Sequence, residues 1–158
     1  MMERIKAKDP AAMRFVGTER YEEGDHDKAI EYCIKAAELG DAVAHYQLGV
    51  MYDEGKGVEK DEEKEIYHLE KAAIGSHPDA RYNLGCVEED NDNMERAVKH
   101  FIIAANLGDK GSMKELWKHY SKGNITKEGL DATLRTHQAA IDEMKSSQRE
   151  EAERFKTT

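Results

Sequence analysis

Small apolar residues recur along the chain at a regular interval. Leu48-Gly49 returns as Leu84-Gly85, and each pair is flanked by polar residues in AHYQLG and ARYNLG. Two antiparallel helices approach closely where their facing surface is shallow, and alanine or glycine at fixed offsets provides such a surface. The pattern therefore predicts repeated helix pairs. Alanine doublets mark the second helix of each pair and begin at Ala36, Ala72, Ala104 and Ala139.

Helix start and stop signals accompany these doublets. Gly40, Gly75 and Gly108 follow the first three doublets within three residues, where a left-handed glycine ends a helix. Asp41 and Asp109 come next as N-caps. Ser76 or His77 fills this role before Pro78, and Asp9-Pro10 begins the first unit in the same way. The sequence predicts an all-α fold in which helix, turn, helix and stop recur about four times.

The quoted segments resemble two related families of helical repeat. Gly24 to Gly40 is similar to the turn and second helix of a tetratricopeptide repeat, and Ala44 to Gly75 is similar to a Sel-one-like repeat. The latter includes the GxGVxxD loop from Gly55 to Asp61. This resemblance implies a right-handed α-α superhelix of about four antiparallel helix pairs with a C-terminal capping helix. It also implies that the first helix of each pair lines a concave groove.

The expected organisation is a short lead-in, four repeats and a charged tail. Trp117 stands in the fourth repeat where the other repeats have glycine, so this unit is degenerate, as terminal repeats commonly are. Met144 and Phe155 of the tail are expected to cover the last helix pair. The predicted boundaries are 1–9 for the lead-in, 10–41 for a tetratricopeptide-like repeat, 42–77 for a Sel-one-like repeat, 78–109 for the third repeat, 110–141 for the degenerate fourth, and 142–158 for the charged helical cap.

Composition narrows the classes of partner. The formal net charge is −9, which disfavours nucleic acid because phosphate backbones need clustered lysine and arginine. No apolar run approaches the roughly 18 residues of a membrane span, and the N-terminus lacks the apolar core of a signal peptide. We therefore expect a cytoplasmic protein with no membrane contact.

Residues capable of catalysis or metal binding are present without a matching pattern. Cys33 aligns with the core positions of Leu69 and Phe101, which predicts a buried thiol. Cys86 falls on a first helix and faces the expected groove. The two cysteines have no zinc-ligand spacing, and no two histidines have the i,i+4 spacing of a helical metal site. We expect no catalytic residue, no metal and no cofactor.

The groove surface follows from the register of each first helix. It is acidic in the middle and basic at its far end, so the predicted partner is a protein or peptide with a basic segment opposite the second and third repeats. The predicted groove residues are Arg14, Thr18, Glu22, Gln47, Val50, Asp53, Glu54, Asn83, Cys86, Glu89, Asp90, Glu115, Lys118 and Lys122.

The leading hypothesis for function is a protein-binding adaptor or scaffold without catalysis. The resemblance leaves two alternatives. The chain could be the substrate-recruiting repeat portion of a larger RING-type ubiquitin-ligase-like protein, and upstream coding sequence with paired cysteines would decide this. The remote alternative is a hydrolase of the β-lactamase-like kind found among Sel-one-like proteins, which requires a nucleophile and a base that the sequence does not identify.

Overall fold

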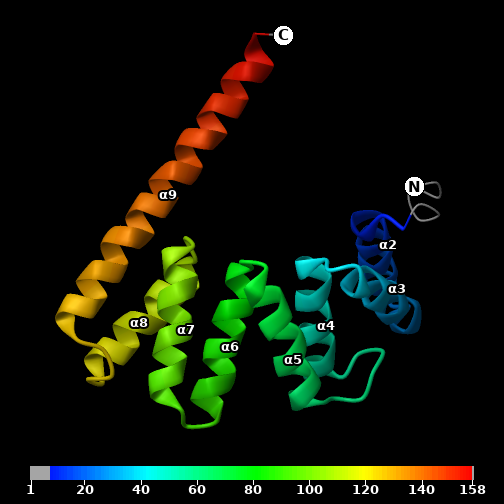
Figure 1. Ribbon diagram of the computed structural model, residues 1–158, viewed down its shortest axis with the longest axis horizontal. Coiled ribbons are helices and arrows are strands. Elements are labelled where there is room, and N and C mark those ends of the chain that lie inside the picture. Colours follow the sequence, from blue (N-terminus) through cyan, green and yellow to red (C-terminus); the bar gives the residue numbers. More distant parts are fainter. Residues whose placement is uncertain (1–7, 158) are drawn as a thin grey trace. The chain divides into compact units, whose positions relative to one another are not determined.

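The computed structural model describes residues 8–157, so most of the predicted lead-in lies outside the described part of the chain. The described residues form eight helices and no strand, which confirms the predicted all-α class (Figure 1). Seven helices have 12 or 13 residues and the last has 30. The helices are α2 Pro10–Glu22, α3 His26–Glu38, α4 Ala42–Glu54, α5 Glu62–Ile74, α6 Pro78–Asp90, α7 Met94–Asn106, α8 Lys110–Ser121 and α9 Lys127–Lys156.

The predicted N-caps are confirmed. Asp9 accepts hydrogen bonds from the backbone amides of α2, Asp41 from the Ala44 amide at 2.8 Å and Asp109 from the Ser112 amide at 2.7 Å. At α6 the sequence left two candidates, and the structure selects His77, whose Nδ1 accepts from the Ala80 amide at 3.3 Å. Each bond satisfies an amide that the first turn of a helix leaves without an intrahelical partner.

All three predicted helix stops are confirmed, but at one of them the predicted left-handed glycine is wrong. Gly40 and Gly108 have φ of 86° and 97°, as expected for a left-handed C-terminal residue, but Gly75 has φ of −77°. Ser76 takes the left-handed conformation instead, with φ of 61°. The left-handed position is the third residue after each doublet, and Gly75 is only the second residue after Ala73. Gly75 serves close packing, because a Cβ at this position would lie 2.5 Å from that of Ala42.

In the first three repeats, the two helices of the pair meet at a glycine. In three repeats the glycine of the first helix faces one buried side chain of the second helix, and these side chains are the predicted core positions. A Cβ at Gly17 would lie 3.0 Å from the sulfur of Cys33, whereas a Cβ at Gly85 would lie 2.5 Å from the ring of Phe101. The contact is tightest where the second helix presents the largest side chain. The pairs are Gly17 with Cys33, Gly49 with Leu69, and Gly85 with Phe101.

The chain divides into two compact units, unit 1 up to Leu84 and unit 2 from Gly85. In unit 1, α2 packs on α3, α3 on α4 and α4 on α5. The loop between α4 and α5 turns back toward the first repeat. A Cβ at Gly57 would lie 2.5 Å from the carbonyl oxygen of His26, at the start of α3. This loop therefore forms a contact between the first two repeats.

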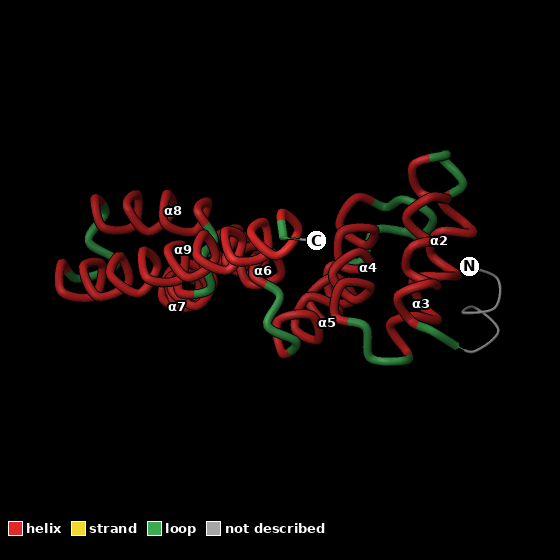
Figure 2. The backbone as a smooth tube through the Cα atoms, turned by 90° about the horizontal axis from the view of Figure 1, so that it is seen from above, coloured by secondary structure: helices red, strands yellow, loops and turns green. Residues whose placement is uncertain are grey.

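In unit 2, α8 and α9 both pack against α7. Trp117 is 50% exposed, since an indole cannot occupy the narrow helix-helix contact that glycine allows in the other repeats. Met144 of α9 contacts the α7 terminus, where a Cβ on Gly108 would lie 2.6 Å from the Met144 methyl carbon. Phe155 is 77% exposed, so the expectation that it covers the last helix pair is wrong. Figure 2 shows α8 along one edge of unit 2, beside α9.

Among residues 8–157, no helix is both long and apolar enough to cross a bilayer.

Candidate binding site in the first-helix surface

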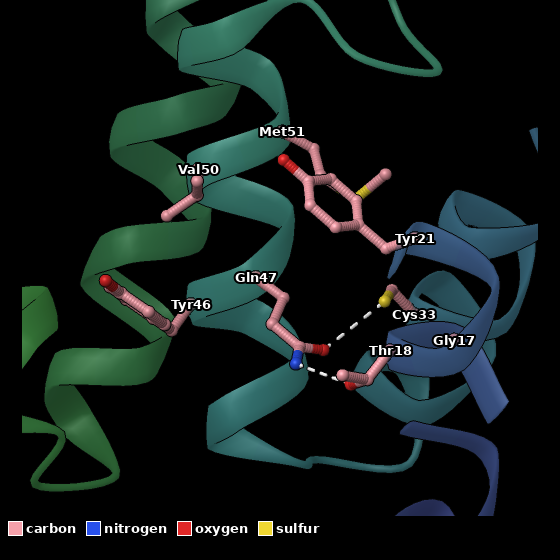
Figure 3. Close-up of a pocket in the computed structure, with 8 residues that line it drawn as sticks. All are labelled: Gly17, Thr18, Tyr21, Cys33, Tyr46, Gln47, Val50 and Met51. Carbon is pink, nitrogen blue, oxygen red and sulfur yellow. Dashed lines mark hydrogen bonds between the residues drawn. The ribbon is translucent and has the colours of Figure 1, made fainter. Parts of the chain in front are cut away.

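A pocket of about 220 Å³ opens between α2 and α4 of unit 1 (Figure 3). Both helices are first helices of their repeats, and α3 contributes the pocket floor. The lining is mainly apolar. The structure brings three of the predicted groove residues, Thr18, Gln47 and Val50, together around this pocket. The full lining is Gly17, Thr18, Tyr21, Cys33, Tyr46, Gln47, Val50 and Met51.

The polar side chains in the pocket bond to one another. The Gln47 amide donates to Thr18 Oγ1 at 3.0 Å, and the Cys33 thiol lies 3.4 Å from Gln47 Oε1 (Figure 3). Burial raises the pKa of Cys33 to about 11, and nearby Asp41 adds to this effect. The thiol therefore stays protonated near neutral pH and is a poor nucleophile. These polar groups fix the shape of the pocket floor.

A hydrogen-bonded group closes one side of the pocket. The Tyr21 hydroxyl donates to Glu54 Oε2 at 2.7 Å and accepts from Lys56 Nζ at 3.2 Å. Lys56 also lies 3.1 Å from the Glu54 carboxylate. The hydrogen bond from Tyr21, followed by that from Lys56, lowers the pKa of Glu54. Glu54 is therefore ionised but already paired, which the sequence register did not indicate.

At the other end of the site, the predicted groove residue Arg14 is also paired. Its Nε lies 3.1 Å from Asp41 Oδ1, and Asp41 is at the same time the N-cap of α4. The Tyr46 ring stacks on His77 with 4.5 Å between ring centroids and an interplanar angle of 18°. Burial raises the pKa of Tyr46, and a hydrogen bond with Asn83 opposes this. Tyr46 thus lines the pocket and also packs on His77, whereas Arg14 is outside the pocket lining and holds Asp41.

Two predicted groove carboxylates of unit 2 are engaged as well. His119 is 2% exposed and lies between Asn124 and Glu89. The Asn124 amide donates to Nδ1, so Nε2 carries the proton and donates to Glu89 Oε1 at 2.7 Å. Glu115 accepts from Lys118 at 2.9 Å. Of the predicted acidic stripe, the exposed residues that form no ion pair within residues 8–157 are Glu22 and Asp90.

Sequence reasoning missed the pocket itself. Tyr21, Tyr46 and Met51 line it from helix positions typical of inter-helix packing, and nothing in their spacing distinguishes a packed aromatic ring from one at the edge of a cavity. The sequence feature that could have pointed to these three residues is their position on first helices. The remaining predicted groove residues lie on α2, α4, α6 and α8, except Lys122, which is the C-cap of α8, and they stay predictions as binding residues.

No more than two histidine side chains come together among residues 8–157. His45 Nδ1 lies 3.0 Å from His68 Nδ1, between α4 and α5, and the two imidazoles share one hydrogen bond. Burial, followed by the charge of His45, lowers the pKa of His68 to about 4. Within the described residues, no three histidine, cysteine or carboxylate side chains converge as a metal site.

The antiparallel helix pairs and their glycine contacts define a helical-repeat protein. The model of the Sel1 repeat matches residues 10–41, 42–77 and 78–109, so the chain belongs to the Sel1 repeat family, as its resemblance predicted. Proteins of this family generally mediate protein-protein interactions.

Curated relatives include the proteins named DAP3-binding cell death enhancer 1 of Rattus norvegicus and Mus musculus. The rat protein is 25% identical over 167 residues, which cover 80% of this chain and 33% of the rat protein. The mouse protein is 26% identical over 166 residues, with 80% and 32% covered. The chain thus spans about a third of the length of these relatives.

Solved structures share the fold. A Sel1 repeat protein from Oxalobacter formigenes superposes with a TM-score of 0.71 at 25% identity, covering 87% of this chain and 60% of that one. The protective antigen c5321 of uropathogenic Escherichia coli, which displays an SLR fold, gives a TM-score of 0.69 at 24% identity, with 89% and 32% covered. These likenesses confirm the helical-repeat superhelix as the fold class.

Proposed function

We propose that this chain is an adaptor that holds a segment of a partner protein on its first helices, with one apolar side chain of the partner in the α2–α4 pocket. The pocket carries the proposal because it is open, mainly apolar and framed by bonded polar groups. At about 220 Å³ it is smaller than the ~300–1,000 Å³ typical of small-molecule sites. One large side chain suits this volume better than a cofactor does.

The charges beside the pocket favour a basic residue next to that apolar side chain. Glu22 follows Thr18 by one helical turn, and Asp53 follows Val50 by nearly one turn. Both carboxylates are exposed, and Asp53 has only a distant contact, 3.9 Å from Lys60. Interface charges of this kind speed association and select partners more than they add affinity. In this proposal the partner's lysine or arginine lies opposite Glu22 and Asp53.

The relatives support protein binding and suggest one probe. The rat and mouse proteins are named as DAP3-binding, so DAP3 is a reasonable first candidate for this chain. A role in binding rather than catalysis is further supported by the protonated, buried Cys33. The proposal includes no reaction and no cofactor.

Site-specific photo-crosslinking tests the pocket. A photoreactive phenylalanine analogue replaces Val50 in one variant and the exposed Glu70 of α5 in a control. We expect crosslinked partner protein from position 50 and much less from position 70. Crosslinking of the position-50 variant to purified DAP3 tests that candidate directly.

A blocking variant completes the test. In this variant the photoreactive analogue is at position 18, and Val50→Arg places a charge in the apolar pocket. We expect binding of the partner to weaken at least tenfold. Circular dichroism confirms that the helices remain. Equal crosslinking from positions 50 and 70, or binding that Val50→Arg leaves unchanged, would overturn the proposal.

A further inference from the structure

The outer face of α8 carries a concentrated positive charge in a chain whose net charge is −9. Lys110, Lys114, Trp117 and Ser121 follow one another at helical spacing and form a single exposed stripe, with Lys118 beside it. In α8 this basic charge is opposed by one carboxylate, Glu115. We call the face formed by Lys110, Lys114, Trp117, Lys118 and Ser121 the basic face.

The basic face is not needed to hold α8 in place. Ser112, Met113, Leu116 and His119 are the buried residues of α8, and they lie on the opposite side of the helix. Figure 2 shows that α8 runs along one edge of unit 2. Packing therefore accounts for one side of this helix and leaves the basic side to solvent.

Most of the cations on this face are also unpaired. Lys118 donates to Glu115 at 2.9 Å, but within residues 8–157 neither Lys110 nor Lys114 takes part in an ion pair. Like charges four residues apart on a helix repel one another, so this spacing costs stability rather than adding it. A negatively charged ligand would offset that repulsion.

An aromatic edge adjoins the cations. Trp117 is 50% exposed and meets the ring of Tyr120 edge-on, with 6.3 Å between the ring centroids. Tryptophan is one of the residues most enriched among those that dominate the binding energy of protein interfaces. An exposed indole among lysines offers a partner both apolar area and charge.

We propose that the basic face of α8 binds an acidic segment of a partner protein, with carboxylates opposite Lys110 and Lys114 and the peptide stem against Trp117. The helix is about 18 Å long, and charges are screened beyond ~8 Å at physiological salt. A ligand on this face therefore responds to the local lysines more than to the net charge. The charge preference is opposite to that of the α2–α4 pocket, so the two sites take different segments.

A protein segment fits this face better than nucleic acid. The stripe has one exposed indole and no arginine, whereas single-stranded nucleic acids bind along rows of aromatic rings within longer basic grooves. Its three lysines could contact few phosphates, whereas nucleic-acid binding gains its affinity from many such contacts. Nucleic acid and anionic lipid remain as outcomes of the experiment.

Trp117 is the single tryptophan of the chain, so its fluorescence reports this face directly. The full chain is titrated with decaglutamate, which has no aromatic absorption, and separately with decalysine. We expect a saturable change in Trp117 emission with decaglutamate that weakens as salt is raised, and no saturable change with decalysine.

Charge-reversal variants test which residues bind. Lys110→Glu/Lys114→Glu is expected to weaken decaglutamate binding by about tenfold or more. Lys145→Glu/Arg149→Glu changes net charge equally on exposed residues of α9 and should leave the affinity unchanged. Val50→Arg, which blocks the unit 1 pocket, should also leave it unchanged, so this proposal and the proposed function can fail separately. Circular dichroism confirms that each variant is folded.

Four results would overturn the proposal. The first two are the absence of a saturable response to decaglutamate and an affinity for decaglutamate that Lys110→Glu/Lys114→Glu does not reduce. The third is tighter binding of a single-stranded oligonucleotide or of phosphatidylserine vesicles than of decaglutamate. The fourth is a Trp117 signal that depends on protein concentration alone, which would indicate a second copy of the chain on this face.

Discussion

Replacing Gly85 with alanine measures how closely α6 and α7 pack in unit 2. A Cβ at this position would lie 2.5 Å from Phe101 Cε1 and 2.8 Å from two further ring carbons. Phe101 has no exposed surface, so its ring cannot move into solvent. The added methyl group must therefore displace a buried ring or separate two helices.

Two opposing effects set the expected magnitude. Alanine is the better helix former by about 1 kcal/mol. Overpacking a well-packed core costs roughly 1–3 kcal/mol, and the short distances at Gly85 favour the upper part of that range. We expect Gly85→Ala to lower the free energy of unfolding of unit 2 by about 1–2 kcal/mol. Gly17→Ala is the matched comparison in unit 1, where the nearest atom is the Cys33 sulfur at 3.0 Å, and its net effect should be smaller.

Urea denaturation followed by Trp117 fluorescence reports unit 2, because the single tryptophan lies in α8. A double-mutant cycle with Phe101→Leu tests the cause, since a smaller side chain should relieve part of the overpacking. A rise in stability of Gly85→Ala by the helix-propensity gain alone, or the absence of coupling with Phe101→Leu, would refute the close contact as the reason for glycine at this position.

Three further predictions concern side chains of unit 1 and Cys86. Because the pKa of folded His68 is lowered from 6.5 to about 4, the unfolded chain binds the proton first as pH falls, and stability should be lost between about pH 6.5 and 4. Since His68 is half-exposed, we expect a loss of about 1 kcal/mol in urea melts. Removing the α6 cap and the ring stacked on Tyr46 by His77→Ala should cost about 1–2 kcal/mol in the same assay. Cys33 should resist a thiol reagent in the folded protein, whereas half-buried Cys86 should react, as mass spectrometry of the labelled chain would show.

Each of these predictions has its own control. His68→Gln should flatten the pH dependence, and an equally steep loss in that variant would assign it to other groups. His77→Asn retains a capping side chain, so full recovery in His77→Asn would leave no energetic role for the stacked ring. Rapid labelling of Cys33 under native conditions would contradict its burial.

The repeat pattern predicted most of the fold because each of its signals acts locally. The alanine doublets, Asp41 and Gly40 decide helix faces and ends within a few residues. The failure at Gly75 has the same origin, because a shift of one residue after the doublet moved the left-handed conformation to Ser76. Local sequence signals thus predict that a helix ends, and the spacing after the alanine doublet decides which residue takes the left-handed conformation.

The site was less predictable because its features depend on residues far apart in the chain. Arg14 pairs with Asp41, 27 residues away, and Glu89 pairs with His119, 30 residues away. The register placed Arg14 and Glu89 on first helices but could not show that each already has a hydrogen-bonding partner within the chain. A pocket is likewise a volume that packing leaves unfilled, and no sequence pattern encodes such a volume directly.

The long loop after α4 has a consequence for cooperativity. It returns to the first repeat through Gly57 and through the bond from Lys56 to Tyr21. In a linear repeat array, stability is approximately the sum of repeat terms and nearest-neighbour interface terms, and this loop strengthens one interface term. The first two repeats should therefore open together in hydrogen exchange, with the amides of α2 and α3 protected as long as the loop stays closed. The long loop of the second repeat thereby helps to keep the first repeat folded.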